Sequence, residues 1–282
     1  MNNRLKWKRA ALLLAAGAAA AGSWAWAMQM ELATTWYEVV LPVGQEGLDG
    51  LKIAQISDVH SADREGPLRA ALEAAAPDLI VMTGDLVNRE DRDLSRALSL
   101  ARMAAETAPA FFAPGNHEVD NLCWPELRDG LEAAGVQVLE DRAVLRNFRG
   151  EAVNLVGLWD VNHDPLGQAH AQETLPERVR ALCREGALNV LLSHRPGLLE
   201  EYGTGGADVV FCGHAHGGQV RLPLVGPVFA PDEGLFPKHT AGVYRTGETQ
   251  MVVSRGLGNG TPYPRLWNGP ELVVVTMKRA GT

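Results

Sequence analysis

The sequence predicts an α/β fold: a single compact domain with two β-sheets and helices packed outside them. From Leu51 onward, short apolar runs alternate with amphipathic stretches, which is typical of a β-α-β-α-β series. In the middle of the chain the apolar runs follow one another with only short breaks, which indicates adjoining strands of a mixed sheet. At 282 residues with 46% hydrophobic side chains, the chain is long enough to bury a substantial core.

The first 30 residues differ in composition from the rest. The leader carries basic residues and no acids: Arg4, Lys6, Lys8 and Arg9. An uncharged, alanine-rich stretch follows over residues 10–30, and about 20 apolar residues suffice to span a bilayer. Residues 1–30 are therefore predicted to be a signal anchor or a signal peptide, with Ala25-Trp26-Ala27 as the cleavage site in the second alternative.

The anchor is the favoured alternative for this segment. Basic residues before the span, with Glu31 and Glu38 after it, predict that the N-terminus stays in the cytoplasm. The expected location is therefore the cell membrane, with a single N-terminal span and the body of the protein on the exported face. Cleavage of the leader would give a secreted form instead.

Residues 31–50 are expected to be a linker and lead-in, and residues 51–282 the main domain. That domain begins with predicted strands at 51–58, 78–85 and 108–118, separated by helices at 67–77, 91–107 and 125–135. Closely spaced strands follow at 136–141, 143–148 and 151–160, then a helix near 173–184 and strands at 187–194 and 207–214. The last third is rich in Gly and Pro and adds strands at 240–246, 250–256 and 271–278.

Charge and cysteine content exclude several kinds of site. The chain has 26 basic and 34 acidic residues, so without the four basic residues of the leader the remainder stands at -12. Such an acidic body is not expected to bind nucleic acid, and an anionic substrate would need local positive charge such as bound metal cations. The three cysteines include no CxxC pair, which argues against a disulfide framework and a structural zinc site.

Polar clusters at five predicted strand ends carry the chemical information. They are Asp58-Val59-His60, Gly84-Asp85, Gly115-Asn116-His117-Glu118, Ser193-His194 and Gly213-His214-Ala215-His216. The carboxyl ends of strands in open α/β sheets converge on a ligand crevice. Taken singly, an Asp here can cap a helix and a His can be a structural residue. Taken together, the five clusters predict a metal site.

Carboxylate, amide and imidazole donors without thiolate suit Mn²⁺, Fe or Zn²⁺. The candidate ligands are Asp58, His60, Asp85, Asn116, His194, His214 and His216. Seven ligands are too many for one tetrahedral ion, whereas they suit two divalent ions that share a bridging carboxylate. We therefore expect a pair of divalent cations, with Mn²⁺ favoured.

In full and in order, these blocks match the pattern DxH, GD, GNHE, H and GHxH, and the chain thereby resembles the calcineurin-like metallophosphoesterase superfamily over about Leu51 to Gln219. The resemblance implies a four-layer αββα sandwich of two mixed β-sheets flanked by helices, with 51–282 as the catalytic domain. It also implies ligand roles: Asp58, His60 and His216 for the first ion, Asn116, His194 and His214 for the second, and Asp85 as the bridge. His117 is left free of metal as the catalytic residue beside the leaving oxygen.

The implied activity is hydrolysis of a phosphodiester or pyrophosphate bond. Two ions about 3.5–4 Å apart lower the pKa of a shared water, and the resulting metal-bridging hydroxide attacks the phosphorus in line. His117 would then assist departure of the leaving group. Some relatives carry an acid three residues after the bridging Asp, where this chain has Asn88, so Glu118 and Asp120 are the candidates to polarise His117.

The stretch after His214 and the end of the chain look similar to the membrane-linked bacterial YkuE-type branch of the superfamily. That similarity implies a small phosphate-ester substrate that is lipid- or nucleotide-linked, such as a UDP-diacylglucosamine-like molecule. Candidates to grip a substrate phosphate are Arg195, Arg221 and Arg265, because a guanidinium offers a two-pronged match. The alternatives are a broad-specificity phosphomonoesterase and a non-catalytic scaffold of the same fold.

Overall fold

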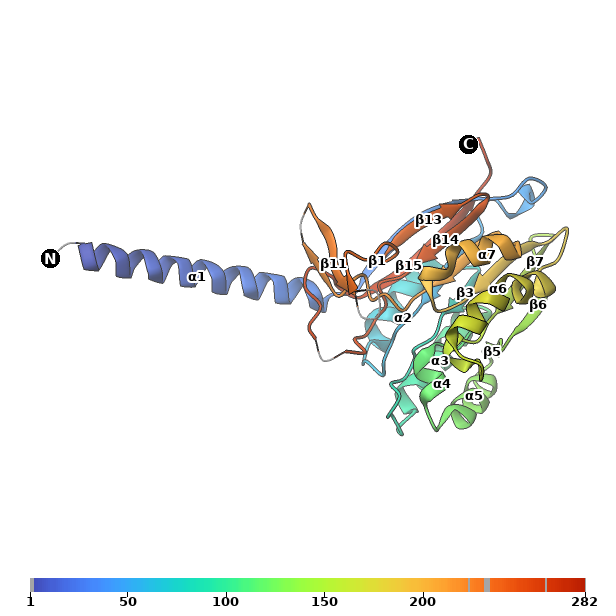
Figure 1. Cartoon of the computed structure of the whole chain (residues 1–282), viewed down its shortest axis with the longest axis horizontal. Helices are drawn as coiled ribbons and strands as arrows, with labels where there is room; N and C mark the ends of the chain where they lie inside the picture. Colours follow the sequence, from blue (N-terminus) through green and yellow to red (C-terminus); the bar gives the residue numbers. More distant parts are fainter. Residues whose placement is uncertain (1–2, 223, 231–233, 262, 282) are drawn as a thin grey trace.

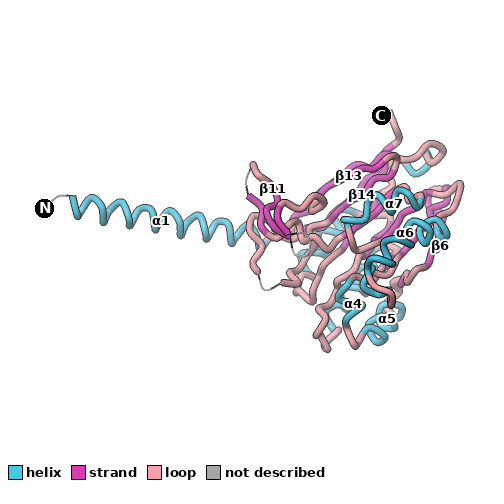
Figure 2. The backbone as a smooth tube through the Cα atoms, viewed as in Figure 1, coloured by secondary structure: helices cyan, strands magenta, loops and turns pink. Residues whose placement is uncertain are grey.

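The computed structural model describes residues 3–222, 224–230, 234–261 and 263–281. Two six-stranded mixed sheets lie face to face, with helices on the outside of each, so the predicted four-layer α/β fold is confirmed (Figure 1). A small three-stranded sheet stands at one end of the body, and the N-terminal helix projects from that same end (Figure 2).

The first sheet has the strand order β1-β15-β2-β3-β4-β5. Its strands are β1 (Ala33–Val40), β2 (Lys52–Ile56), β3 (Leu79–Met82), β4 (Ala110–Phe112), β5 (Gln137–Val138) and β15 (Glu271–Lys278). Neighbours run parallel except for β15 and β2, which pair antiparallel. Parallel pairing of β2, β3 and β4 follows from the helices that connect them.

The second sheet has the strand order β13-β14-β9-β8-β7-β6. Its strands are β6 (Arg142–Phe148), β7 (Glu151–Gly157), β8 (Leu188–Leu192), β9 (Val209–Cys212), β13 (Gly242–Thr246) and β14 (Thr249–Val253). The central strands β7, β8, β9 and β14 are parallel, and a hairpin partner flanks each edge. The small third sheet consists of β10 (Val220–Leu222), β11 (Gly226–Ala230) and β12 (Gly234–Leu235).

Alternation along the strands builds three hydrophobic layers. On β2, Ile53 points to the cluster between the two sheets, whereas Ala54 points to the cluster under the helices. The helices over the first sheet are α2 (Glu65–Ala75), α3 (Ser95–Thr107) and α5 (Trp124–Ala133). The helices over the second sheet are α6 (Gln168–Leu182) and α7 (Leu199–Gly205). Successive side chains of a strand point to opposite faces of its sheet. A strand therefore has to be apolar throughout to contribute to the hydrophobic layer on each face.

Several segments differ from the sequence prediction, and one of them is helix α7, which was not predicted. Residues 33–40, placed in the lead-in, form the edge strand β1, whose half-exposed and polar side chains give only a weak strand pattern. Helix α6 begins at Gln168, directly after Gly167 at φ 93°, and therefore earlier than residue 173. The small third sheet was not predicted, because its short strands lie in a Gly- and Pro-rich stretch.

Helix α1 (Asn3–Met30) extends away from the body, and its leucines at positions 12, 13 and 14 are 74 to 75% exposed (Figure 1). Among the residues whose structure is described, no helix has the length and apolar character needed to cross a membrane. The signal anchor predicted for residues 1–30 is therefore not confirmed.

Candidate active site

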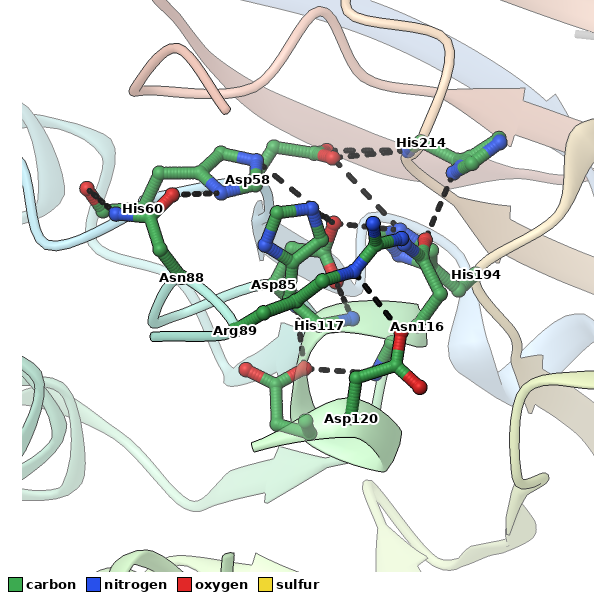
Figure 3. Close-up of polar contacts among 12 residues, drawn as sticks. Asp58, His60, Asp85, Asn88, Arg89, Asn116, His117, Asp120, His194 and His214 are labelled. Atoms are coloured by element: carbon green, nitrogen blue, oxygen red, sulfur yellow. Dashed lines mark hydrogen bonds and ion pairs between the residues drawn. The ribbon is translucent and has the colours of Figure 1, made fainter. Parts of the chain in front are cut away.

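Strand ends from both sheets bring the predicted site residues to one place (Figure 3). They are Asp58 and His60 after β2, Asp85 after β3, Asn116 and His117 at the start of α4 (Asn116–Asp120) after β4, His194 after β8, and His214 and His216 after β9. The carboxyl ends of strands converge here from two sheets that face one another. Asp58 and His216, which are 158 positions apart in the sequence, therefore belong to one site.

Most of these residues have left-handed backbone conformations. Their φ angles are 49° at Asp58, 48° at His60, 56° at Asp85, 67° at His214 and 47° at His216. Such conformations are rare for residues with a Cβ, cost about 1–3 kcal/mol each, and cluster at functional sites. Hydrogen bonds hold them in place: the backbone N–H of His60 donates to the carbonyl of Asp85, and that of His214 donates to the carboxylate of Asp58, both at 3.0 Å.

Glycine allows the two sheets to meet at the pocket. Gly213, at the end of β9 in the second sheet, lies against Ser57 and Asp58 of the first sheet. A side chain at Gly213 would overlap Ser57 Oγ and the Asp58 carboxylate. The Gly in the Gly-His-x-His block therefore permits the close approach that places both ligand sets in one pocket.

Three groups of donor atoms converge closely enough to hold a cation, with all ligand atoms of a group within 4.8 Å of one another. The groups are Asp58 with His60 and His216, His60 with Asp85 and His117, and Asp58 with Asp85 and His194. Each group shares members with the others, so the donors form one continuous cluster. Buried oxygen and nitrogen donors of this kind fit Mn²⁺, Fe or Zn²⁺.

In the first group, the two imidazole nitrogens His60 Nε2 and His216 Nε2 lie 3.2 Å apart. His216 Nε2 is 3.6 Å from Asp58 Oδ1. Burial lowers the pKa of His60 to about 3 and, with the positive charge of Arg265, holds the pKa of His216 well below its usual range. Both rings are therefore neutral, the protonation state that a metal ligand requires.

Asp85 and His194 form the centre of the cluster. His194 Nε2 lies 3.1 Å from Asp85 Oδ2, and His194 Nδ1 donates to the carbonyl of Thr83 at 2.7 Å. Burial alone would raise the pKa of Asp85 and lower that of His194. Their mutual attraction outweighs burial, so the pKa of Asp85 falls well below its usual range and the pKa of His194 rises to about 10. Without cations, this pair is an ion pair.

Asn116 and His214 lie on the other side of the cluster. His214 Nδ1 is 3.0 Å from Asn116 Oδ1, and the opposite ring nitrogen, Nε2, is 2.9 Å from Arg195 Nη1. An arginine also donates to His216, where Arg265 Nη2 is 2.8 Å from Nδ1. Since a guanidinium has no acceptor, each arginine places the proton of its imidazole on the nitrogen that faces the cluster. A cation that binds to this nitrogen has to displace its proton or shift the arginine.

His117 lies beside the cluster at the pocket surface, with 14% of its side chain exposed. Its backbone N–H donates to Asp85 Oδ1 at 2.9 Å, and its Nε2 lies 3.9 Å from Asp85 Oδ2. Among the described residues, its buried Nδ1 has no hydrogen-bond partner. Burial lowers the pKa of His117, and Arg89 adds to the same direction. The ring therefore keeps its buried Nδ1 without a protein partner and has its Nε2 on the side of Asp85.

Glu118 and Asp120, which the sequence offered as partners that polarise His117, have other roles. Glu118 is buried and accepts backbone N–H groups of Asp85 at 2.7 Å, of Leu86 at 2.8 Å and of Gly115 at 2.8 Å. Asp120 pairs with Arg89 at 2.9 Å. Neither carboxylate is hydrogen-bonded to His117 in the described part of the chain, and Asp120 acts on that ring only through its charge, which raises the pKa of His117.

The three candidate substrate arginines have different surroundings. Arg195 lies between His214 and Asp160 and is 15% exposed, so it borders the centre. Arg265 is buried behind His216 and donates to the carbonyl of Arg255 at 2.7 Å. Arg221 donates to the carbonyl of Gly217 at 2.7 Å and to Thr240 Oγ1 at 3.3 Å. Arg195 is the best placed of the three to meet a substrate.

Sequence reasoning missed Arg89 and Asp160. Arg89 lies in the loop after β3 and beside His117 (Figure 3), and Asp160, after β7, holds Arg195 at 2.7 Å. Asp160 closes a predicted apolar run, as Asp58 and Asp85 do, so its position at a strand end was a usable signal. No comparable signal marks Arg89, which sits in a polar loop.

Comparison with known proteins agrees with this geometry. The uncharacterized metallophosphoesterase YkuE of Bacillus subtilis is 29% identical over 255 residues, which cover 88% of this chain and 86% of that protein. The phosphodiesterase YaeI of Escherichia coli is 30% identical, covering 79% of this chain and 82% of that protein. The UDP-2,3-diacylglucosamine pyrophosphatase LpxG of Chlamydia muridarum is 24% identical, covering 83% and 86%.

The sequence model of the calcineurin-like phosphoesterase family matches residues 51–218. This range begins just before β2 and ends two residues after His216, so it contains every candidate ligand and more than half of the chain. The chain therefore belongs to the calcineurin-like phosphoesterase family, whose members are metal-dependent phosphoric ester hydrolases.

Proposed function

We propose that this chain hydrolyses a phosphodiester or pyrophosphate bond with the help of two divalent ions. The observation that carries the proposal is the overlap of the three donor groups at Asp58, His60 and Asp85. Overlapping groups favour two adjacent cations over a single isolated one. Asp85 belongs to two groups and makes the shortest carboxylate contact to His194, which makes it the best bridging ligand.

Each cation would have its own ligand set. Asp58, His60 and His216 would hold the first ion, Asn116, His194 and His214 the second, and Asp85 both. Mn²⁺ suits this mixture of oxygen and nitrogen donors, as do Fe and Zn²⁺. When bound, such ions activate water as a nucleophile and stabilise the charge that grows on the phosphoryl oxygens.

The residues of the chain then orient the substrate and move a proton. His117 borders the cluster with its Nε2 3.9 Å from Asp85 Oδ2, so its ring can hold a proton beside the leaving oxygen. Protonating that oxygen eases its departure, since an alkoxide is a poor leaving group. Arg195, fixed by Asp160, would pair with a phosphoryl oxygen at the edge of the centre.

The substrate class follows from the relatives and from one feature of the surface. YaeI is named a phosphodiesterase and LpxG a UDP-2,3-diacylglucosamine pyrophosphatase. The segment that carries Arg265 toward His216 also exposes Tyr263 and Trp267, at 62% and 41%. Exposed aromatic side chains in the segment that holds Arg265 favour a lipid-linked or nucleotide-linked substrate with an apolar portion.

Hydrolysis of a small panel of esters tests the proposal. Full-length protein loaded with Mn²⁺ is expected to cleave bis(p-nitrophenyl) phosphate faster than p-nitrophenyl phosphate, and to cleave UDP-diacylglucosamine. Preference for the monoester would indicate a phosphomonoesterase of broad specificity. If the loaded protein cleaves none of these esters and Asp85→Asn changes nothing, the chain is a scaffold without catalysis.

The location of the protein stays the prediction made from its leader, a single N-terminal membrane segment with the body on the exported face. Protease treatment of intact spheroplasts tests it. Digestion of the body is expected, whereas protection would place the body in the cytoplasm.

A further inference from the structure

A cavity of about 650 Å³ opens on the His214 side of the candidate metal centre. Its size lies within the roughly 300–1,000 Å³ range of small-molecule sites. The polar side chains that line it are Arg89, Asn162, Gln168, Gln172, Arg195, Glu201 and His214. His214 and Arg195 belong to the edge of the centre as well, so a substrate held there can extend into the cavity without a break.

Arg195 is fixed at the boundary between the centre and the cavity. Its Nε and Nη2 donate to the two carboxylate oxygens of Asp160 at 2.7 and 3.2 Å, and its Nη1 lies 2.9 Å from His214 Nε2. The Asp160 carboxylate is fully buried. This bidentate pair sets the direction of the guanidinium before any ligand arrives.

Arg89 provides a second guanidinium in the lining of the cavity. Its Nε pairs with Asp120 Oδ2 at 2.9 Å, and its side chain is 46% exposed. Within the described part of the chain, Nη1 and Nη2 of Arg89 have no hydrogen-bond partner. Figure 3 shows Arg89 and Asp120 beside His117, and the charge of Arg89 acts on that ring. The free edge of the guanidinium therefore lies close to where a phosphate would bind.

The rest of the wall suits a hydroxylated group. Gln168 donates to Asn162 Oδ1, so these amides are held together, and Gln172 is exposed on the next turn of α6. Amide groups both donate and accept hydrogen bonds, which matches sugar hydroxyls and the edges of a nucleobase. A cavity with an arginine near the centre and amides farther out fits a charged group followed by a polar, uncharged one.

We propose that this cavity holds a nucleoside diphosphate or sugar diphosphate portion of the substrate, with Arg89 pairing with the phosphate next to the one that is cleaved. This deepens the function proposed above and depends on it. It assigns Arg89 as a substrate-positioning residue and the amides of Asn162, Gln168 and Gln172 as the contacts for the sugar or base.

Binding of a non-hydrolysable probe tests the assignment without turnover. Titration calorimetry on the full chain loaded with Mn²⁺ would compare α,β-methylene-ADP with inorganic phosphate, in the native protein, in Arg89→Gln and in the matched control Arg92→Gln. Arg92 is exposed on the same loop and donates only to the carbonyl of Asp91 among the described residues. Gln172→Ala probes the outer wall.

The native protein is expected to bind α,β-methylene-ADP at least tenfold more tightly than phosphate. Arg89→Gln should weaken α,β-methylene-ADP about tenfold or more, the effect of losing a charge-assisted hydrogen bond, and change phosphate less than twofold. Arg92→Gln should change neither, and Gln172→Ala should weaken α,β-methylene-ADP alone.

Equal loss of both ligands in Arg89→Gln would show that Arg89 acts on the metal centre and would overturn the assignment. Unchanged binding of α,β-methylene-ADP would overturn it too. Because the readout is binding, the two proposals fail separately. If the protein cleaves bis(p-nitrophenyl) phosphate but Arg89→Gln does not change binding, the proposed function stands and the cavity assignment fails. If binding depends on Arg89 but no ester is cleaved, the cavity assignment stands and the proposed function fails.

Discussion

Asn88 Oδ1 lies 3.1 Å from His60 Nδ1, on the side of the ring opposite the Nε2 that faces His216. An amide oxygen only accepts, so His60 carries its proton on Nδ1 and keeps a lone pair on Nε2. Asn88 is itself held by Asp91, whose carboxylate accepts from its backbone N–H at 2.8 Å. The residue three positions after Asp85 therefore orients a candidate metal ligand and makes no contact with His117 that would polarise it.

Replacement of Asn88 should weaken metal binding. Asn88→Ala removes the group that fixes the tautomer of His60 and is expected to lower Mn²⁺ affinity about 10- to 100-fold, the usual cost of losing such a partner. Asn88→Asp should keep or raise the affinity. Titration of EDTA-treated protein measures both. Asn147→Ala is the control, because Asn147 is exposed near the end of β6 and, among the described residues, its side chain accepts only from the backbone N–H of Gly150. Unchanged affinity in Asn88→Ala would contradict the orienting role.

Cation binding should release protons. Burial alone would lower the pKa of His194, but Asp85 and Asp58 raise it to about 10, so without metal this ring is protonated at pH 7.5. A ligand imidazole must be neutral, and the cation therefore expels that proton. Affinity should rise with pH, by about tenfold per unit for one proton, up to about pH 10.

Titration calorimetry of Mn²⁺ into EDTA-treated protein, in two buffers of different ionisation enthalpy, measures this release. Burial raises the pKa of Asp58 to about 6, so below that pH a second proton opposes binding and the dependence should steepen. Heats that do not depend on the buffer would show that His194 is already neutral and would remove the ion pair with Asp85.

The strands that carry the ligands and the ligand positions could be predicted from the sequence for one physical reason. Continuous apolar runs mark strands buried on both faces, and polar residues at their carboxyl ends converge whatever their separation in the chain. This reasoning brought Asp58 and His216 together, although they come from different sheets. It also gave α2, α3 and α5 over the first sheet and α6 over the second, with α6 starting a few residues early, whereas α7 was not predicted.

The side-chain partners could not be predicted in this way. Which carboxylate meets which donor depends on backbone direction over one or two residues, as at Glu118, which faces the N–H groups of Asp85 and Leu86 and points away from His117. Left-handed angles at Asp58 and His60 also leave no mark in the composition. Arg89 lies in a loop without periodicity, so nothing in the sequence indicated its pairing with Asp120.

Glu118 should be a major determinant of stability. Glu118→Ala leaves three buried backbone N–H groups without a protein partner and is expected to lower the free energy of unfolding by about 3 kcal/mol or more. In a protein of this size, that corresponds to a fall in Tm of roughly 6–12 °C. Thermal unfolding followed by circular dichroism measures the change.

Glu126→Ala, on the exposed first turn of α5, is the control for Glu118 and should shift Tm by no more than about 1–2 °C. Because the three N–H groups belong to the loops that carry Asp85 and Asn116, Glu118→Ala should also lose bound metal. A variant as stable as the native protein would mean that water replaces the carboxylate without cost.

Removal of His117 should affect substrates according to their leaving groups. If His117 protonates the leaving oxygen, His117→Ala should lower kcat about 10²- to 10⁴-fold for an alkyl phosphodiester, whose alkoxide leaves poorly. For bis(p-nitrophenyl) phosphate the loss should be far smaller, because p-nitrophenolate departs without a proton. Metal content should not change, since the seven proposed ligands remain.

His170→Ala is the matched control, because His170 is half-exposed and pairs with Asp164 away from the cluster. Equal loss of kcat for both substrates, with metal retained, would assign His117 to binding of the phosphoryl group and exclude it as the acid.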